Sequence, residues 1–220
     1  MFKKLTTVFT AFCLCFLTAC GSGEPASAPN VNSDEKSAVQ EKLDANDGAK
    51  VLVAFFSRAD ENYNVGTISK GNTQIIAEYI AEQIGADSYQ IETVTPYPAD
   101  YDDCKDRASQ EKSDNARPEI IGNVENMDSY DIVFLGYPIW WGDMPMAVYT
   151  FMESYDFSGK VIIPFNTHEG SGNAGTDSKI KNALPNSQVL SGLVMQGATA
   201  QKFSSDTQDT VRSWLDDLGF

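Results

Sequence analysis

The sequence predicts an α/β fold, in which a doubly wound parallel sheet of five strands lies between two layers of helices. Two near-continuous apolar runs, 51–56 and 132–135, are typical of central strands that are buried on both faces. Helical stripes alternate with the strands, and right-handed crossovers leave few strand orders to choose from. We favour the order 2-1-3-4-5, which places the loops after strands one and three on either side of one crevice.

The apolar pattern justifies each element in chain order. After the first strand, Ile76, Ile80 and Ile84 form a helical stripe within 72–84, which Gly85 ends. The segment 89–92 alternates as a short edge strand does. The same alternation predicts a helix over 100–113, a strand over 132–135, a helix over 145–153 with Pro in its first turn, a strand over 161–166, a helix over 176–184, a strand over 188–194 and an amphipathic helix around 211–218.

Residues 1–19 have the pattern of an export signal. Lys3 and Lys4 precede an apolar run that is too short to span a bilayer. The segment Leu17-Thr18-Ala19-Cys20 resembles the lipobox of bacterial lipoproteins, which implies cleavage before Cys20 and lipidation of its thiol. We therefore expect a membrane-anchored, extracytoplasmic lipoprotein. The alternative is an ordinary signal peptide followed by a coincidental cysteine.

We expect residues 20–49 to be the lipidated cysteine and a flexible tether, and residues 50–220 to be the folded domain. Gly, Ser, Pro, Asn and acidic residues dominate 21–49, where only 37–43 has the pattern of a short helix. A flexible coil of this length reaches about 30 Å. The remaining domain is long enough for one complete hydrophobic core.

Charge and cysteine content exclude several kinds of site and partner. The formal net charge of −15, which becomes more negative when a leader with two lysines is removed, argues against nucleic acid and anionic headgroups as partners. Cleavage would leave Cys20 for lipid and Cys104 alone in the domain, so no disulfide is expected within one chain. Cys104 is interpreted as incidental. With one histidine and no carboxylate cluster at ligand spacing, no metal site is expected.

The loop after the first strand has the features of an anion site. It begins with Ser57-Arg58 and ends with Gly71-Asn72-Thr73 at the start of a predicted helix. Unpaired N–H groups and the positive end of the helix dipole bind phosphate there, and hydroxyl groups add donors. An ordinary N-cap formed by Asn72 or Thr73 is the alternative.

Two adjacent tryptophans, Trp140 and Trp141, follow the strand at 132–135. Large rings at the carboxyl end of a central strand are placed to stack on a flat ligand. Alternatively, both indoles fill the hydrophobic core.

Taken together, these loops resemble those of flavodoxins. The likeness is carried by Ser57-Arg58, Gly71-Asn72-Thr73 and Trp141-Gly142-Asp143, and the wider pattern 136–142 resembles a flavodoxin-like branch of bacterial proteins. It implies non-covalent FMN, with Trp141 stacked on the isoalloxazine and the Gly142 peptide near flavin N5. The implied cofactor site comprises Ser57, Arg58, Gly71, Asn72, Thr73, Pro138, Ile139, Trp140, Trp141, Gly142, Asp143, Thr167, His168, Glu169 and Gly170.

Two departures from this resemblance bear on function. The insertion 59–70 is either a lid or surface decoration, and Arg58 and Lys70 at its ends are either phosphate partners or solvated. The third loop, 167–173, lacks the aromatic residue that covers the second flavin face in many flavodoxins. It leaves room for a flat substrate, to which His168 is our candidate catalytic proton donor. A hydrogen bond from His168 to the flavin and a solvent-facing histidine are the alternatives.

The first functional hypothesis is an FMN-binding redox protein that carries electrons outside the cytoplasm to a partner protein or a quinone-like acceptor. A flavin-dependent quinone-type reductase that uses NAD(P)H is the second, and a ligand-binding module without redox work is the third. The segment Gln196-Gly197-Ala198-Thr199 only partly resembles a covalent FMN attachment site, because it fails at Gln196.

Overall fold

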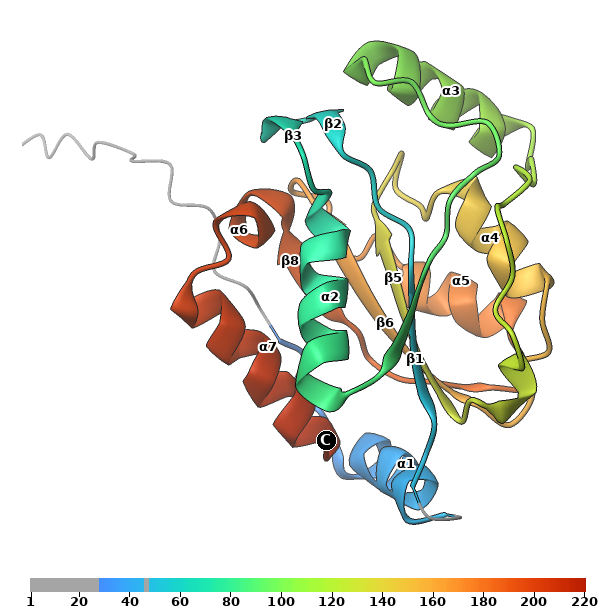
Figure 1. The fold of residues 1–220 in the computed structure, drawn as a ribbon, viewed down its shortest axis with the longest axis vertical. Helices are drawn as coiled ribbons and strands as arrows, with labels where there is room; N and C mark the ends of the chain where they lie inside the picture. Colours follow the sequence, from blue (N-terminus) through green and yellow to red (C-terminus); the bar gives the residue numbers. More distant parts are fainter. Residues whose placement is uncertain (1–27, 46–47) are drawn as a thin grey trace, which may run out of the picture.

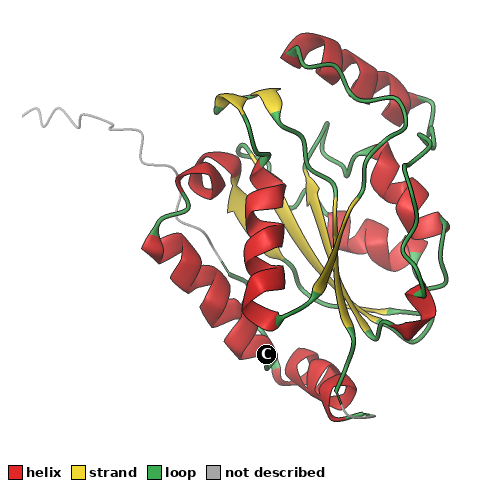
Figure 2. Cartoon of the chain, in the orientation of Figure 1, coloured by secondary structure: helices red, strands yellow, loops and turns green. Residues whose placement is uncertain are grey.

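The computed structural model describes residues 28–45 and 48–220 and has three layers, with a central parallel sheet between helices (Figures 1 and 2). The strand order is β4-β1-β5-β6-β7, which confirms the predicted order 2-1-3-4-5. The sheet contains β4 Asp87–Gln90, β1 Val51–Phe55, β5 Ile132–Pro138, β6 Val161–His168 and β7 Gln188–Val189.

Two helical layers cover the sheet and create two cores. Alternate residues of β1 point to opposite faces, so Val53 packs with α2 and α7, whereas Leu52 packs with α4 and α5. Both faces are buried, as the apolar run predicted. The helices of these layers are α2 Asn72–Ile84, α7 Ser205–Leu218, α4 Met146–Glu153 and α5 Thr176–Ala183. Gly85 ends α2 in a left-handed conformation, and Pro145 is the N-cap of α4 rather than its first helical residue.

The folded part begins before residue 50, which corrects the predicted tether. Helix α1, Ser33–Asp44, starts with a capping box between Asn32 and Glu35 and packs against α7. Val39 is fully buried in the core that α7 shares. The carboxylate of Glu35 also accepts a hydrogen bond from the Ser191 N–H at 2.7 Å. The predicted leader and Cys20 lie outside the described residues.

The fifth strand is split, which corrects the predicted strand 188–194. β7 pairs with Val161 and Ile162, whereas β8, Leu193–Gln196, pairs with β6 from Phe165 onward. One extra residue separates the two registers, and Gly192 lies so close to β6 that a Cβ would be 2.5 Å from the Pro164 carbonyl oxygen. β8 then leads into a short helix, α6 Gly197–Lys202, which the sequence pattern did not predict.

The insertion 59–70 forms an antiparallel hairpin at the carboxyl edge of the sheet (Figure 1). It contains β2 Asp60–Asn62 and β3 Gly66–Ile68. Helix α3, Tyr101–Ser113, lies at the same end of the molecule, and η1, Met127–Ser129, precedes β5. Within the part of the chain that the structure describes, no helix has the length and apolarity needed to cross a bilayer.

Candidate functional site

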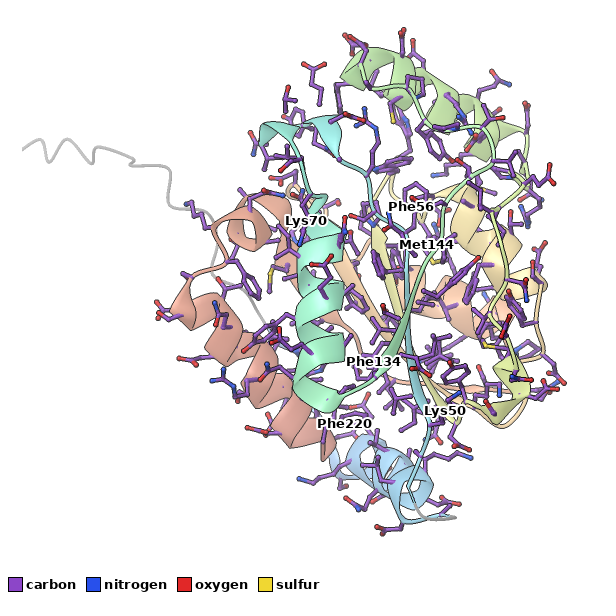
Figure 3. The ribbon with its side chains drawn as sticks, in the orientation of Figure 1. Lys50, Phe56, Lys70, Phe134, Met144 and Phe220 are labelled. Carbon is purple, nitrogen blue, oxygen red and sulfur yellow. The ribbon has the colours of Figure 1, made fainter. Side chains whose placement is uncertain are left out.

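A cavity of about 300 Å³ opens at the carboxyl edge of the sheet. Its walls come from the loops after β1, β5 and β6, from the hairpin β2–β3 and from α3, whereas the buried side chains of Phe56 and Met144 belong to the core at the same end (Figure 3). The lining comprises Arg58, Asn62, Tyr63, Asn72, Tyr101, Cys104, Lys105, Ala108, Pro138, Ile139, Trp140, Trp141, Gly142, Thr167, His168, Glu169 and Ser171.

The N-terminus of α2 offers backbone donors beside this cavity. Ser57 Oγ accepts a hydrogen bond from the Gln74 N–H at 3.0 Å, so Ser57 caps the helix in place of its N-cap residue, Gly71. A Cβ on Gly71 would lie 2.2 Å from Ser57 Oγ, which explains the glycine. Among the described residues, nothing accepts a hydrogen bond from the N–H groups of Asn72 and Thr73. These donors and the helix dipole are the features that the predicted anion site requires.

The side chains of this loop make hydrogen bonds within the protein. Thr73 is buried, and its Oγ1 is 2.8 Å from Thr167 Oγ1, so its hydroxyl joins α2 to β6 instead of facing the cavity. The Asn72 side chain accepts a hydrogen bond from Gln201 of α6 at 2.8 Å. Asn72 nevertheless lines the cavity, so its side-chain amide as well as its backbone N–H faces a ligand there.

Arg58 and Lys70 are both engaged within the protein. Arg58 donates hydrogen bonds to the carbonyl oxygens of Glu61, Pro98 and Ala99. Lys70 forms an ion pair with Glu78 at 2.5 Å. Burial raises the pKa of Glu78 and the hydrogen bond from Lys70 lowers it, and the net result is a lowered pKa. Arg58 therefore fastens the hairpin to the segment before α3, and neither cation is held ready for a phosphate.

The tryptophan loop is a tight two-residue turn. Trp140 and Asp143 exchange backbone hydrogen bonds at 2.8 and 3.0 Å, and Trp141 and Gly142 both have positive φ, 53° and 69°. A bulky residue in this conformation is strained. Hydrogen bonds to α3 hold it there: Trp141 Nε1 donates to the Lys105 carbonyl at 2.9 Å, and Lys112 Nζ donates to the Trp141 carbonyl.

The two indoles have different surroundings. Trp140 packs edge-on against Phe56 and Tyr97, with ring centroids 5.3 and 5.1 Å away. Trp141 is 52% exposed and lines the cavity. Trp140 is thus fixed as part of the wall, and Trp141 has a ring face for a ligand.

Asp143 is buried and is not among the residues that line the cavity. Its side chain forms an ion pair with Lys179 of α5 at 2.7 Å and accepts a hydrogen bond from the Tyr149 hydroxyl of α4 at 3.0 Å. Burial and the Asp143 charge raise the pKa of Tyr149. Lys179 also donates to the Gly142 carbonyl at 3.0 Å. Asp143 therefore positions Gly142 through Lys179.

The third loop connects β6 to the hairpin and to α6. His168 Nδ1 accepts a hydrogen bond from the Gly170 N–H at 2.9 Å, so a neutral His168 carries its proton on Nε2. Glu169 accepts hydrogen bonds from the Ala198 N–H at 3.0 Å and from Asn64 at the hairpin tip at 3.1 Å. His168 and Glu169 line the cavity, whereas Gly170 does not.

Seven lining residues are absent from the predicted site. Asn62 and Tyr63 come from the hairpin and Ser171 from the third loop, and the other four lie on one face of α3 at helical spacing i, i+3, i+4 and i+7, which was the overlooked signal. Burial raises the pKa of the Cys104 thiol, which agrees with an unreactive cysteine. The α3 residues are Tyr101, Cys104, Lys105 and Ala108. No cluster that could hold a metal ion occurs within 28–45 and 48–220.

Comparisons with known proteins agree with this architecture. The family model described as flavodoxin matches residues 50–218. The chain is 30% identical to a protein of Bacteroides eggerthii described as a flavoprotein, with 79% of this chain and 99% of that one covered and a TM-score of 0.62. For its counterpart from Bacteroides uniformis the identity is 29%, the coverage 77% and 99%, and the TM-score 0.62.

A more distant structure contains a cofactor. The flavoprotein of Lactobacillus acidophilus in complex with FMN is 20% identical, with 72% of this chain and 100% of that one covered and a TM-score of 0.53. At this identity it supports the fold alone. Among curated proteins, none matches the chain. Because the family model spans the whole domain from β1 to α7, the chain belongs to the flavodoxin family.

Proposed function

We propose that this protein binds FMN non-covalently in the cavity and works as a redox protein that carries electrons. One observation carries the proposal: the N-terminal end of α2, through Asn72, and the half-exposed indole of Trp141 line the same cavity. The first fits a phosphate and the second fits a flat ring, and FMN contains both. The FMN complex of the Lactobacillus acidophilus relative supports this choice.

The residues would divide the work of binding. The N–H groups of Asn72 and Thr73 would hold the phosphate, and Trp141 would stack on the isoalloxazine. The space beside Gly142 is open to the ring, since nothing lies within 4 Å of where its Cβ would be. FMN supplies the redox chemistry when bound, and the protein orients it. His168, which lines the cavity, is our candidate for holding a proton at Nε2.

Spectroscopy of the purified protein tests the proposal. Bound FMN should give a flavin absorption spectrum, and titration of the apo-protein should quench FMN fluorescence with saturation. Trp141→Ala should weaken binding by about 1 kcal/mol, roughly fivefold in Kd. Ile121→Ala removes an equally exposed apolar side chain that does not line the cavity and serves as the matched control. A colourless protein that quenches nothing would favour the ligand-binding module without redox work.

We also propose that the protein acts outside the cytoplasm. The export signal at 1–19 and the lipobox ending at Cys20 support a lipoprotein anchored outside the cytoplasm. Metabolic labelling with a radioactive fatty acid tests it. Cys20→Ala should abolish incorporation, and Cys104→Ala, which removes a buried thiol of the domain, should retain it. Equal labelling of both variants would contradict lipidation at Cys20.

A second candidate function is a flavin-dependent reductase of quinone-type acceptors. The specific observation in its favour is that aromatic side chains of the hairpin and α3 line the cavity together with Trp141. Turnover of quinones with NAD(P)H by the FMN-loaded protein tests this candidate, and no turnover despite bound FMN would refute it.

A further inference from the structure

The hairpin β2–β3 and helix α3 together form a roof over the cavity. The hairpin is tied to the start of α3 because Glu61 accepts a hydrogen bond from the Tyr101 N–H at 3.1 Å and donates its own N–H to Ala99 at 3.2 Å. Asn64 at the tip reaches Glu169 on the far side at 3.1 Å. From α3, the Lys105 carbonyl holds the Trp141 indole. The roof is therefore attached to the third loop at one side and to the tryptophan turn at the other.

Two tyrosines from the roof line the cavity. Tyr63 at the hairpin and Tyr101 at the start of α3 have ring centroids 6.0 Å apart and ring planes inclined by 31°. Tyr63 is 59% exposed, so burial in the core does not explain its place at the tip of a polar hairpin. The Lys105 ammonium, which pairs with Asp102 at 2.5 Å, lies 5.8 Å from the Tyr101 ring, and an ammonium group has two further N–H donors to offer to this wall.

We propose that Tyr63 and Tyr101 form a subsite for a small, planar, quinone-type electron acceptor, which enters beneath the hairpin. This inference rests on the proposed FMN function and assigns its acceptor. The acceptor ring gains two electrons and two protons and becomes a hydroquinone, and the reduced FMN that supplies them returns to its oxidised form. Aromatic stacking selects a flat ring, and the Lys105 ammonium can donate a hydrogen bond to an acceptor carbonyl.

The roof favours a small acceptor over a protein partner. Hydrogen bonds tie it to the third loop through Asn64 and to the tryptophan turn through Lys105. Tyr63 and Tyr101 line a cavity of about 300 Å³, which is on the scale of small-molecule sites. An acceptor that reaches both rings inside this cavity is therefore a small molecule.

Anaerobic reoxidation of the chemically reduced, FMN-loaded protein tests the subsite. The oxidants are a water-soluble p-benzoquinone and ferricyanide, which has no ring to stack. Reoxidation by the quinone should saturate with its concentration in the wild type. Tyr63→Leu should raise the half-saturating concentration about tenfold. The FMN affinity of Tyr63→Leu and its rate of reoxidation by ferricyanide should stay unchanged. Tyr63→Phe should behave as the wild type. Val94→Ala, which changes an exposed side chain outside the cavity, is the control.

The outcomes separate this inference from the proposed function. If Tyr63→Leu binds FMN normally and its quinone kinetics are unchanged, the subsite is wrong and the FMN proposal stands. If Tyr63→Leu loses FMN affinity, the ring covers the flavin instead, and the subsite is again wrong. If the wild type binds no FMN, the proposed function fails and the inference falls with it.

Discussion

Different interactions stabilise the sheet side of the cavity, here called its floor, and its roof. The floor consists of loops that leave the carboxyl ends of β1, β5 and β6. The residues of these three strands are almost completely buried and paired within the sheet. The roof is held by polar contacts: β2 and β3 contain no buried residue, and α3 buries only Cys104 and Ala108. The sheet therefore sets the geometry of the floor, and surface hydrogen bonds hold the roof in place. Segments with few buried apolar contacts open locally at low free energy.

Gly71→Ala should disrupt the floor, and we expect it to have the largest effect on unfolding free energy and FMN affinity. The added Cβ would lie 2.2 Å from Ser57 Oγ and 2.5 Å from the Arg58 carbonyl oxygen, so the backbone has to shift at the anion site. Overpacking of this kind costs about 1–3 kcal/mol of unfolding free energy, and FMN affinity should fall at least tenfold. Urea denaturation and FMN titration measure the two effects.

Gly142→Ala is the matched glycine control for that prediction. Nothing lies within 4 Å of its Cβ position, so the expected cost is that of a positive φ alone, about 1 kcal/mol. An unfolding free energy that falls more for Gly142→Ala than for Gly71→Ala would contradict the steric account of the floor.

Arg58→Met tests whether the roof opens without the floor. The substitution removes the hydrogen bonds to the carbonyl oxygens of Glu61, Pro98 and Ala99 but keeps the apolar part of the side chain. Amide exchange should become faster across 60–68, while the global unfolding free energy changes by less than about 1 kcal/mol. Hydrogen exchange followed by mass spectrometry reports both regions, with β5 as the internal reference. Equal acceleration in β5 would mean that the floor and the roof open as one unit.

Alkylation of the Cys104 thiol measures how well the roof shields this side chain from solvent. Burial is the largest influence on the Cys104 pKa and raises it above the ordinary value of 9.0, because a buried thiolate loses its hydration. The thiolate is therefore scarce at pH 8, and alkylation by iodoacetamide should be slow and should still increase as the pH rises past 9.0. A labelling rate that levels off below pH 9 would show that the thiol is not shielded.

The floor could be predicted from the sequence because its determinants are local. Apolar runs fix the central strands, Gly85 fixes the end of α2, and the carboxyl ends of parallel strands necessarily meet at one edge. The roles within the floor were less predictable. The division between Trp140 and Trp141 depends on Phe56 and Tyr97, which come from distant parts of the chain.

The parts that could not be predicted depend on tertiary contacts of polar segments. The sequence pattern indicated only the part 37–43 of helix α1, because the helix buries just Glu35, Ala38 and Val39, too narrow an apolar face to show that it packs against the domain. The hairpin has no apolar alternation, since its strands are polar and exposed, and hydrogen bonds from Arg58 and Asn64 place it. Such contacts join residues that no local pattern relates.

The smallest expected effect concerns the contact at the hairpin tip. Asn64→Asp keeps the size of the side chain and tolerates the positive φ of 67°, but it places a carboxylate beside Glu169. Because the contact is exposed, the repulsion amounts to a few tenths of a kcal/mol and is screened by salt. The roof should open more often at low ionic strength, so FMN should dissociate up to about twofold faster there, and the difference should vanish in roughly 1 M salt. Asn64→Gly, which removes the hydrogen bond without adding charge, should show no salt dependence beyond the wild type. Stopped-flow measurement of FMN release compares the three proteins, and a salt-independent acceleration in Asn64→Asp would mean that the lost hydrogen bond, and not charge, holds the roof closed.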